Sequence, residues 1–478
     1  MDIVIFGIGK YFASRRAELR KIMPGKDSIV AFIDNKISEP KEFSGLPLLN
    51  PRSLSDLSFD IVLLMSASAN EMREQLLKLH VATNKILTHQ EYVVLARRND
   101  YKLRLNKIAS QPTLRVLLVH NTLKYDGGAM CVLYAAHALI ARGHEVWVMA
   151  PDADENFLHD LDDGNVNVIL YQNLSIVRGE DLSWLSFFDV VLVNVFHMIR
   201  AACEISKNRK AIWWLHEPSQ RYCDVYGYHR KKYTEYDNTE TMKNLRILAV
   251  SNIAKRNFEE FYPGRIDGLL TYGMPDKIKQ LDIKAHDLNK PIVIAVIGVV
   301  YSLKGIDVFV KAACKVIATN TTNVEFRIIG RFPNDDYTAK FSDAIAENKQ
   351  IKVCGILTRD EMREAFNQID IVVCSSLEET MSLTITEGMM CGKVCITTDN
   401  TGIADFIEDG VNGFVCRAGD ANSLSEKMQY AIENFDNLID MRRNARQTYE
   451  KYFTLENFGE RLERELLKVR KKDDKQVR

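Results

Sequence analysis

The sequence lacks the features that mark several classes of protein. Its nine cysteines, among 478 residues, are odd in number and scattered, and no two of them form a Cys-x-x-Cys pair. This spacing argues against a disulfide framework or a zinc site and favours buried thiols in a reducing compartment. Lysine and arginine number 63 against 64 aspartates and glutamates. The chain therefore presents no strong basic field that would attract nucleic acid.

Long apolar segments are also missing. The opening MDIVIFGIGK predicts a strand from the second residue, not a basic leader followed by an apolar signal core. The apolar runs IVLLMSA and DVVLVNVF are far shorter than the roughly 20 residues that span a bilayer. We therefore expect a cytoplasmic protein, and we leave open its peripheral attachment to the inner face of a membrane.

What the sequence does contain is a long alternation of short apolar runs and helix-length segments. Three series of such runs follow one another, from DIVIFG to DIVLLMSA, from LRVLLVH to RILAVS, and from PIVIAVIG to KVCITT. Runs that are apolar on both faces and separated by helices predict parallel strands covered by helices. Because the chain is too long for one core, we predict an α/β fold with three Rossmann-like sheets.

Polar segments that precede fresh strands set the predicted domain boundaries. The predicted parts are a small Rossmann-like module (1–100), a linker (101–112), a second Rossmann-like domain (113–285), a third (286–450), and a C-terminal helix that returns toward the second domain and ends in a charged tail (451–478).

The stretch SSLEETMSLTITEGMMCGK, residues 375–393, carries glutamates on both sides of a predicted helix start, among them Glu379 and Glu387 with seven residues between them. In open α/β sheets, ligands bind beyond the carboxyl ends of strands, where helix N-termini present unpaired N–H groups. We expect a helix to begin near residue 382 or 383. Glu387, one turn inside it, would accept hydrogen bonds from sugar hydroxyls, with Glu379 at the mouth, although Glu378 competes for that position. The backbone N–H groups expected to face an anion are those of Thr380, Met381, Ser382 and Leu383.

This Glu-x7-Glu pattern and the GMMCGKVCITTDNTGIADFIEDGVNGFV that overlaps its end resemble the donor-site signature of retaining glycosyltransferases of family four, which have the two-domain GT-B fold. The resemblance covers residues 113–465 and includes Ser376 and the glycines at 392, 402, 410 and 413. It implies transfer of a sugar, with retained configuration, from a nucleotide diphosphate to a glycan or lipid-linked hydroxyl acceptor in cell-surface polysaccharide synthesis. It implies neither a metal nor a cofactor besides the nucleotide-sugar donor.

Three upstream motifs extend the resemblance. In KYDGGAM, Gly127 and Gly128 resemble the turn whose backbone approaches the donor diphosphate or the acceptor. In WWLHEP, His216 resembles the histidine that contacts the donor sugar. In VIGVVYSLKGID, Lys304 resembles the lysine that pairs with the diphosphate. The resemblance thus implies a catalytic set of Glu379, Lys304 and His216.

The chain departs from the family pattern at a few positions. Val299 stands where an arginine usually precedes the lysine, so one of two cationic phosphate contacts is missing. Thr380 and Ser382 replace glycines, and Asp405 replaces a longer acid. The missing arginine at Val299 keeps open an alternative, a catalytically weak GT-B subunit that binds nucleotide and acts with a partner transferase, and the other departures matter less. Epimerisation of a nucleotide sugar and phosphorolysis also remain open.

The first hundred residues carry part of a dinucleotide fingerprint. Gly7 and Gly9 follow a predicted strand and Asp34 ends the next one, but Phe12 and Ala13 stand near the place of the third glycine. The module resembles small nucleotide-binding-like units fused to bacterial sugar-modifying enzymes and glycosyltransferases. An NAD-dependent sugar-modifying activity centred on this turn is the second alternative, and we favour a structural or docking role.

Overall fold

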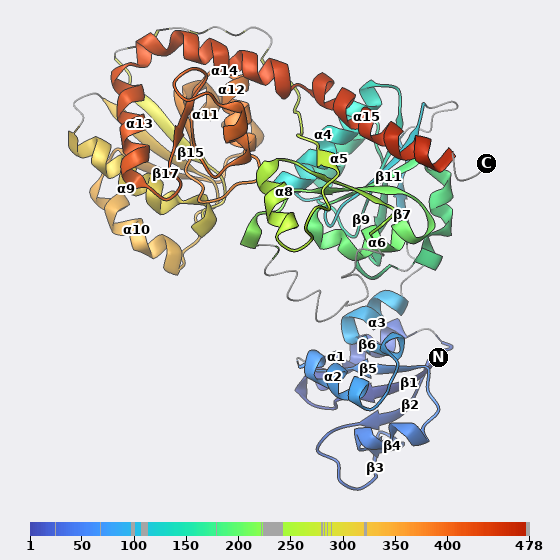
Figure 1. Ribbon diagram of the computed structural model, residues 1–478. Helices are drawn as coiled ribbons and strands as arrows, with labels where there is room; N and C mark the ends of the chain where they lie inside the picture. The colour runs from blue at the N-terminus through green and yellow to red at the C-terminus, as the bar shows by residue number, and fades with distance from the viewer. Residues whose placement is uncertain are drawn as a thin grey trace.

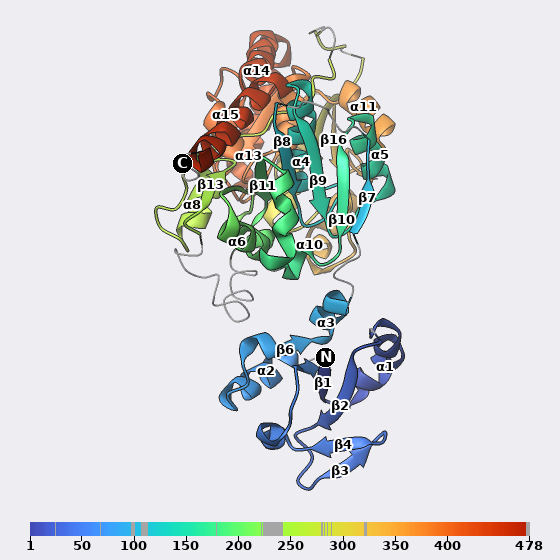
Figure 2. The ribbon, with the colours of Figure 1, turned by 90° about the vertical axis from the view of Figure 1, so that its right-hand side faces the viewer.

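Three mainly parallel sheets flanked by helices make up the computed structural model (Figure 1). The sheets have six, eight and six strands in chain order, which confirms the predicted α/β class. Two views at right angles show the first sheet standing apart from the other two (Figures 1 and 2). The structure describes residues 1–23, 25–66, 68–96, 101–106, 113–177, 179–220, 222, 242–278, 281, 283, 285–287, 289–319 and 323–474.

The first unit, residues 1–96, has the strand order β3-β4-β2-β1-β5-β6, and only β3 runs antiparallel to its neighbour. Its central strand is buried at every position after the first residue, as its apolar sequence predicts. The unit contains β1 (Asp2–Phe6), α1 (Lys10–Ile22), β2 (Ser28–Ile33), β3 (Lys41–Phe43), β4 (Leu46–Leu49), β5 (Ile61–Leu64), α2 (Ala69–Lys78), β6 (Ile86–Thr88) and α3 (His89–Ala96).

The second unit, residues 101–274, has the order β14-β13-β12-β11-β8-β9-β10-β7. All of its strands pair in parallel except β7, which is antiparallel to β10. The unit contains β7 (Tyr101–Arg104), β8 (Arg115–Val119), α4 (Gly127–Ala141), β9 (Glu145–Ala150), α5 (Glu155–Asp163), β10 (Asn167–Tyr171), β11 (Val190–Asn194), α6 (Ile199–Asn208), β12 (Ala211–Leu215), β13 (Leu245–Ala249), α8 (Asn252–Glu259) and β14 (Gly268–Leu269).

Strand β7 corrects the predicted linker at 101–112. Its four residues belong to the second sheet, where Tyr101 stacks on Tyr171 at a ring-centroid distance of 4.5 Å and Arg104 pairs with Asp162. The charged sequence of this segment suggested a connection, but an edge strand has one side open to water and tolerates charges there. Residues 107–112 of the predicted linker lie outside the described residues.

The third unit, residues 289–452, is wholly parallel, with the order β17-β16-β15-β18-β19-β20. It contains β15 (Ile292–Ile297), α9 (Ile306–Thr319), β16 (Val324–Ile329), α10 (Asp336–Glu347), β17 (Ile351–Gly355), α11 (Arg359–Gln368), β18 (Ile371–Cys374), α12 (Leu383–Met390), β19 (Val394–Thr398), β20 (Phe414–Cys416), α13 (Ala421–Glu433) and α14 (Ile439–Tyr452).

The last helix, α15 (Leu455–Asp474), leaves the third unit and lies along the second (Figure 1). Glu463 pairs with Arg142 at 2.6 Å, and Glu465 pairs with Arg246 at 2.6 Å. Leu462, Leu466 and Val469 of α15 belong to the same buried cluster as the apolar side chains of α4, which explains why α4 is buried on most of its circumference. Residues 475–478 of the predicted charged tail lie outside the described residues.

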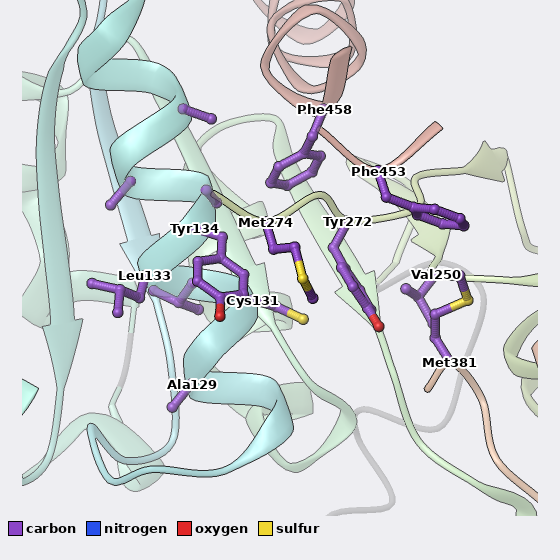
Figure 3. Packing of buried hydrophobic residues seen from close by; sticks show 14 of the residues in the cluster. Ala129, Cys131, Leu133, Tyr134, Val250, Tyr272, Met274, Met381, Phe453 and Phe458 are labelled. Carbon is purple, nitrogen blue, oxygen red and sulfur yellow. The ribbon is translucent and has the colours of Figure 1, made fainter. Parts of the chain in front are cut away.

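One apolar cluster joins the second and third units where the chain passes between them. Tyr272 and Met274, on the crossing segment, lie between α4 and the junction of α14 with α15 (Figure 3). Phe453 and Phe458 approach from that junction, and Met381 approaches from the third unit beside Val250. The two units thus share a core at this point.

Candidate active site

The carboxyl ends of the second and third sheets face each other. Thr380, in the loop after β18, donates its hydroxyl proton to the carbonyl oxygen of His216, which follows β12, at 2.6 Å. Ser251, which caps α8, donates in turn to the carbonyl oxygen of Thr380 at 2.5 Å. Both ends are the positions at which open α/β sheets bind ligands. The candidate site therefore lies between the two units.

Glu378 and Glu379, the two candidates for the first acid of the motif, point to different units. Glu378 accepts hydrogen bonds from the N–H and hydroxyl of Ser219, at 2.6 and 2.5 Å, and from the amide of Asn257 at 2.7 Å. We call these contacts the Glu378 bridge. Glu379 instead forms an ion pair with Lys304 and accepts a hydrogen bond from Ser376 at 3.3 Å, both within the third unit.

Lys304 is held in place by the turn after β15. The next residue, Gly305, has φ +60°, and a Cβ there would collide with the carbonyl oxygen of Ser375, so the turn requires glycine. Burial alone would lower the pKa of Lys304, but the attraction of Glu379 outweighs it and raises the pKa. Lys304 is thus a cation over a wide pH range. It lines a pocket at the ends of β15 and β18 together with Gly298, Ser375, Ser376 and Thr384.

Helix α12 begins at Leu383, within the predicted range, and Ser382 is its N-cap. The Ser382 hydroxyl accepts from the N–H of Ile385. Thr384, the second helical residue, lines the pocket, and the N–H groups of a first helical turn have no partner within the helix. An oxyanion in this pocket would meet Lys304 from one side and the start of α12 from the other.

Glu387 lies one turn inside α12, with its side chain about three-quarters buried. Burial raises the pKa of Glu387, and the ammonium group of Lys277, 3.5 Å away, offsets part of this effect. The sequence motif thus places Glu379 and Glu387 at the two ends of one loop and helix start. Met381, in contrast, turns its side chain into the core shared by the two units.

Gly128 has a packing role that the sequence did not indicate. A Cβ on this residue would lie 3.0 Å from Cε1 of His120, whereas a Cβ on Gly127 would meet no atom within 4 Å. The open backbone that the sequence assigned to both glycines is therefore found at Gly127. At Gly128 the missing side chain makes room for an imidazole ring.

His216 is half-buried at the end of β12, and its ring packs edge-on against Trp214. Burial lowers the pKa of His216 to about 3, with a smaller contribution from His120. The imidazole is therefore neutral at physiological pH. Its buried Nε2 atom has no hydrogen-bond partner among the described residues.

The position of the missing arginine, Val299, is exposed at the end of β15. The N–H of the next residue, Val300, donates to the carbonyl oxygen of Arg331 at 3.0 Å. Arg331 is exposed and follows the neighbouring strand β16. The structure thus has a guanidinium on the adjacent loop, which the family pattern did not predict.

In the first unit, Gly7 (φ +96°) and Gly9 form the turn between β1 and α1. Asp34 accepts from the N–H of Ile8 in that turn, at 3.3 Å. Phe12, near the place of the third glycine, is buried against Phe32. The Asp34 carboxylate thus occupies an N–H group of the turn that would otherwise be available to a dinucleotide phosphate. Its negative charge also opposes the binding of a phosphate at this turn.

No cluster of three or more metal-ligating side chains occurs among the residues that the structure describes. In the same part of the chain, no helix combines the length and apolarity needed to cross a membrane. The eight cysteines described are free thiols.

Comparison with known proteins bears on the third unit first. Residues 278–448 match the family model of the glycosyl transferases group 1. This match runs from the segment before β15 into α14 and includes Lys304, Glu379 and Glu387. Residues 1–87 match a separate model described as C2185-like, N-terminal.

The chain is also similar in sequence to curated proteins, among them a synthase and a glycosyltransferase. A trehalose synthase from Thermococcus litoralis is 25% identical over 319 residues, which is 61% of this chain and 72% of that protein. The amylovoran biosynthesis glycosyltransferase AmsK from Erwinia amylovora is 26% identical over 157 residues, 31% of this chain and 38% of that one.

Solved structures show that the second and third units together have the GT-B fold. Anabaena HepE in complex with UDP-glucose aligns with a TM-score of 0.61 at 16% identity, over 74% of this chain and 100% of its own. Sucrose-phosphate synthase from Thermosynechococcus elongatus aligns with a TM-score of 0.59 at 15% identity, over 74% and 99%. The predicted GT-B pair is confirmed at the level of the fold.

Proposed function

We propose that this protein is a retaining, metal-independent glycosyltransferase that moves a sugar from a nucleotide diphosphate to a hydroxyl acceptor in cell-surface glycan synthesis. The observation that carries the proposal is the group formed by Lys304, Glu379, the start of α12 and Glu387 at the carboxyl edge of the third sheet. The loop that carries Glu379 is joined to the second unit by the hydrogen bond from Thr380 to the carbonyl oxygen of His216. The group 1 match and the UDP-glucose complex of a GT-B neighbour support a nucleotide-sugar donor.

Each residue has a distinct role in this proposal. Lys304 and the N–H groups of Leu383 and Thr384 stabilise the negative charge that develops on the leaving diphosphate. Glu387 accepts hydrogen bonds from the nucleoside hydroxyls next to it. Glu379 and His216 contact the transferred sugar from opposite units. Attack on the face that the diphosphate leaves, assisted by the leaving phosphate itself, gives retention of configuration.

In the free protein Glu379 is the partner of Lys304, so donor binding changes this ion pair. A diphosphate oxygen that enters the pocket shares the ammonium group with the Glu379 carboxylate. This sharing frees carboxylate oxygens of Glu379 to accept hydrogen bonds from the sugar. The ion pair therefore holds both side chains in position before the donor arrives.

We place this activity in the cytoplasm, with a glycan or lipid-linked acceptor and contact with the inner membrane face as part of the proposal. The exposed Val299 favours a second candidate function, a weak nucleotide-binding subunit that needs a partner transferase. Robust turnover by the isolated chain would eliminate that candidate.

The first experiment measures thermal shifts and calorimetric binding with UDP, GDP, dTDP, their sugar conjugates and NAD(H). A ligand present at about 100 times its dissociation constant adds roughly 2.7 kcal/mol to the stability of the unit that binds it. We expect one nucleoside diphosphate to bind, and Glu387→Ala to abolish the response.

A control for this variant is Glu426→Ala, which removes an exposed glutamate on α13 far along the chain from the loop. Unchanged binding and transfer in Glu387→Ala, with a proven donor, would refute the proposed site.

A further inference from the structure

The end of β8 carries a buried histidine that the proposed mechanism does not use. His120 is 1% exposed, and its backbone N–H donates to the carbonyl oxygen of Met149 at 2.9 Å. Its ring lies between the end of β11, at Asn194 and Val195, and the first turn of α4, at Gly128. His120 thus lies at the carboxyl edge of the second sheet, the same edge at which the carbonyl oxygen of His216 accepts a hydrogen bond from Thr380 of the third unit.

The hydrogen bonds of Asn194 fix which ring nitrogen of His120 carries the proton. The side-chain amide N of Asn194 lies 3.1 Å from the carbonyl oxygen of Gly128 and 3.1 Å from Nδ1 of His120. A carbonyl oxygen only accepts, so the atom that faces both partners must be the NH2 group of Asn194. Nδ1 of His120 is therefore an acceptor, and a neutral imidazole carries its proton on Nε2.

That Nε2–H group is a donor without an acceptor. It is buried and has no hydrogen-bond partner among the described residues, and the same is true of Nε2 of His216. Leaving a buried donor unpaired costs about 1–3 kcal/mol, so two such atoms at the sheet edge where ligands bind in this fold class indicate a ligand that supplies the missing partner.

The surroundings of His120 define the chemistry of that partner. Asp126 places a carboxylate at the start of α4, where it accepts from the N–H of Ala129 at 2.8 Å. This charge opposes an anion at the same helix start and suits a neutral oxygen. The open space beside Gly127 gives such a group access to this turn. A hydroxyl oxygen of a sugar meets these conditions.

We propose that His120 binds the sugar of the nucleotide donor by donating its Nε2 proton to a hydroxyl oxygen of that sugar. The proposal rests on the proposed function. The donor sugar is favoured over the acceptor because the ring of His120 is near His216, which lies against the loop that carries Glu379. His120 is a binding residue and not a general base, since Nδ1 faces an N–H group and Nε2 already holds a proton.

Two substitutions separate this role from a structural one. His120→Asn keeps an acceptor near the place of Nδ1, which preserves the contact with Asn194, and removes the distal donor. His120→Gln restores an N–H donor near the place of Nε2 and loses the contact with Asn194. A purely structural role predicts that Gln is the more damaging change, and a sugar-binding role predicts that Asn is.

The measurement is the affinity gained from the sugar, taken as the ratio of dissociation constants for the nucleoside diphosphate that binds and for its glucose, galactose, mannose and N-acetylglucosamine conjugates. We expect His120→Asn to bind the bare diphosphate as the wild type does. The ratio of dissociation constants that measures the gain from the sugar should be about tenfold smaller in this variant than in the wild type. His120→Gln should recover most of the gain.

Three outcomes would overturn the inference while leaving the proposed function intact. They are equal gains in His120→Asn and the wild type, a larger loss in Gln than in Asn, and a wild type that gains nothing from any of the four sugars. Failure of every nucleotide to bind the wild-type chain would instead refute the proposed function itself.

Discussion

The first and third units each carry a strand, a glycine-containing turn and a helix, but the charges at the two turns differ. After β15, the turn ends at Lys304, whose ammonium group lines a pocket next to the start of α12. After β1, the turn receives the carboxylate of Asp34 on the N–H of Ile8. Similar backbone arrangements thus favour an oxyanion in one unit and oppose it in the other. A glycine turn alone does not define a phosphate site.

Removing the cation of the third unit should have the largest effect. We expect Lys304→Ala to lower kcat/KM by at least roughly hundredfold, because one preorganised donor at a developing charge contributes that much. Lys311→Ala, which removes an exposed lysine of α9 that pairs with Asp307, is the matched control and should match the wild type. Steady-state kinetics with the identified donor tests both variants. A kcat/KM of Lys304→Ala equal to that of the wild type would show that the third unit's turn does not act through its cation.

Acid should weaken nucleotide binding through Glu387. Burial raises the pKa of this carboxyl, so its loss of charge begins at a higher pH than for an exposed glutamate. We expect affinity to fall about tenfold for each pH unit below that pKa, because only the carboxylate accepts two hydroxyl protons. Protonation also favours the folded state, since the folded pKa exceeds the unfolded one, so weaker binding would not reflect unfolding at this residue.

Calorimetry across pH tests this expectation. In Glu387→Gln, residue 387 should contribute little to nucleotide affinity at any pH, and this contribution should not change with pH. The same steep fall in the glutamine variant would assign the acid sensitivity to another group.

The Glu378 bridge should contribute less than Lys304. Glu378→Ala removes three hydrogen bonds between the units and leaves the buried amide of Asn257 without this acceptor. We expect kcat/KM to fall roughly tenfold, from an interface weakened by about 1–3 kcal/mol. Glu378→Gln should lose less, because its oxygen still accepts.

Small-angle scattering provides a readout beyond rate for these variants. The alanine variant should have a larger radius of gyration without ligand and should return to the wild-type value when nucleotide binds. An unchanged radius together with an unchanged rate would show that the bridge does not control closure.

Disruption of the first turn should have the smallest effect on transfer. Asp34→Ala removes bonds to the N–H groups of Ile8 and Lys36 and should lower the stability of the first unit by about 1 kcal/mol, with no change in transfer rate. NAD(H) should leave the melting profile of the wild type unchanged. Stabilisation by NAD(H), lost in Asp34→Ala, would reverse the comparison and favour the dinucleotide alternative.

The parts of the fold predicted well from sequence depend on local patterns. Continuous apolar runs identified the central strands, and the change from Ser382 to an apolar helical spacing located the start of α12. The predicted linker was wrong at β7. Lys102 and Arg104 lie on an edge strand, which lacks the continuous apolar run that identified the central strands.

The features that the sequence did not reveal are contacts between distant residues. Glu378 meets Ser219 across 159 positions, and no local spacing indicates which of two adjacent glutamates turns toward the other unit. Gly128 and His120 are neighbours in the sequence, yet their packing depends on Asn194, 66 residues beyond Gly128. The roles of the predicted site residues remain predictions, because only the positions of their side chains follow from the structure.

The path of the chain limits how the second and third units move. The segment at Met274 and the junction at Thr454 form a β-bridge, and the hydroxyl of Tyr449 donates to the carbonyl oxygen of Met274 at 3.0 Å. A Cβ on Gly273 would collide with the carbonyl oxygen of Thr454, so the two segments touch backbone to backbone. Both covalent crossings between the units therefore lie at one place, and they act as a single hinge. Any swing about this hinge that separates the units must break the Glu378 bridge together with the hydrogen bonds that Thr380 and Ser251 make across the interface.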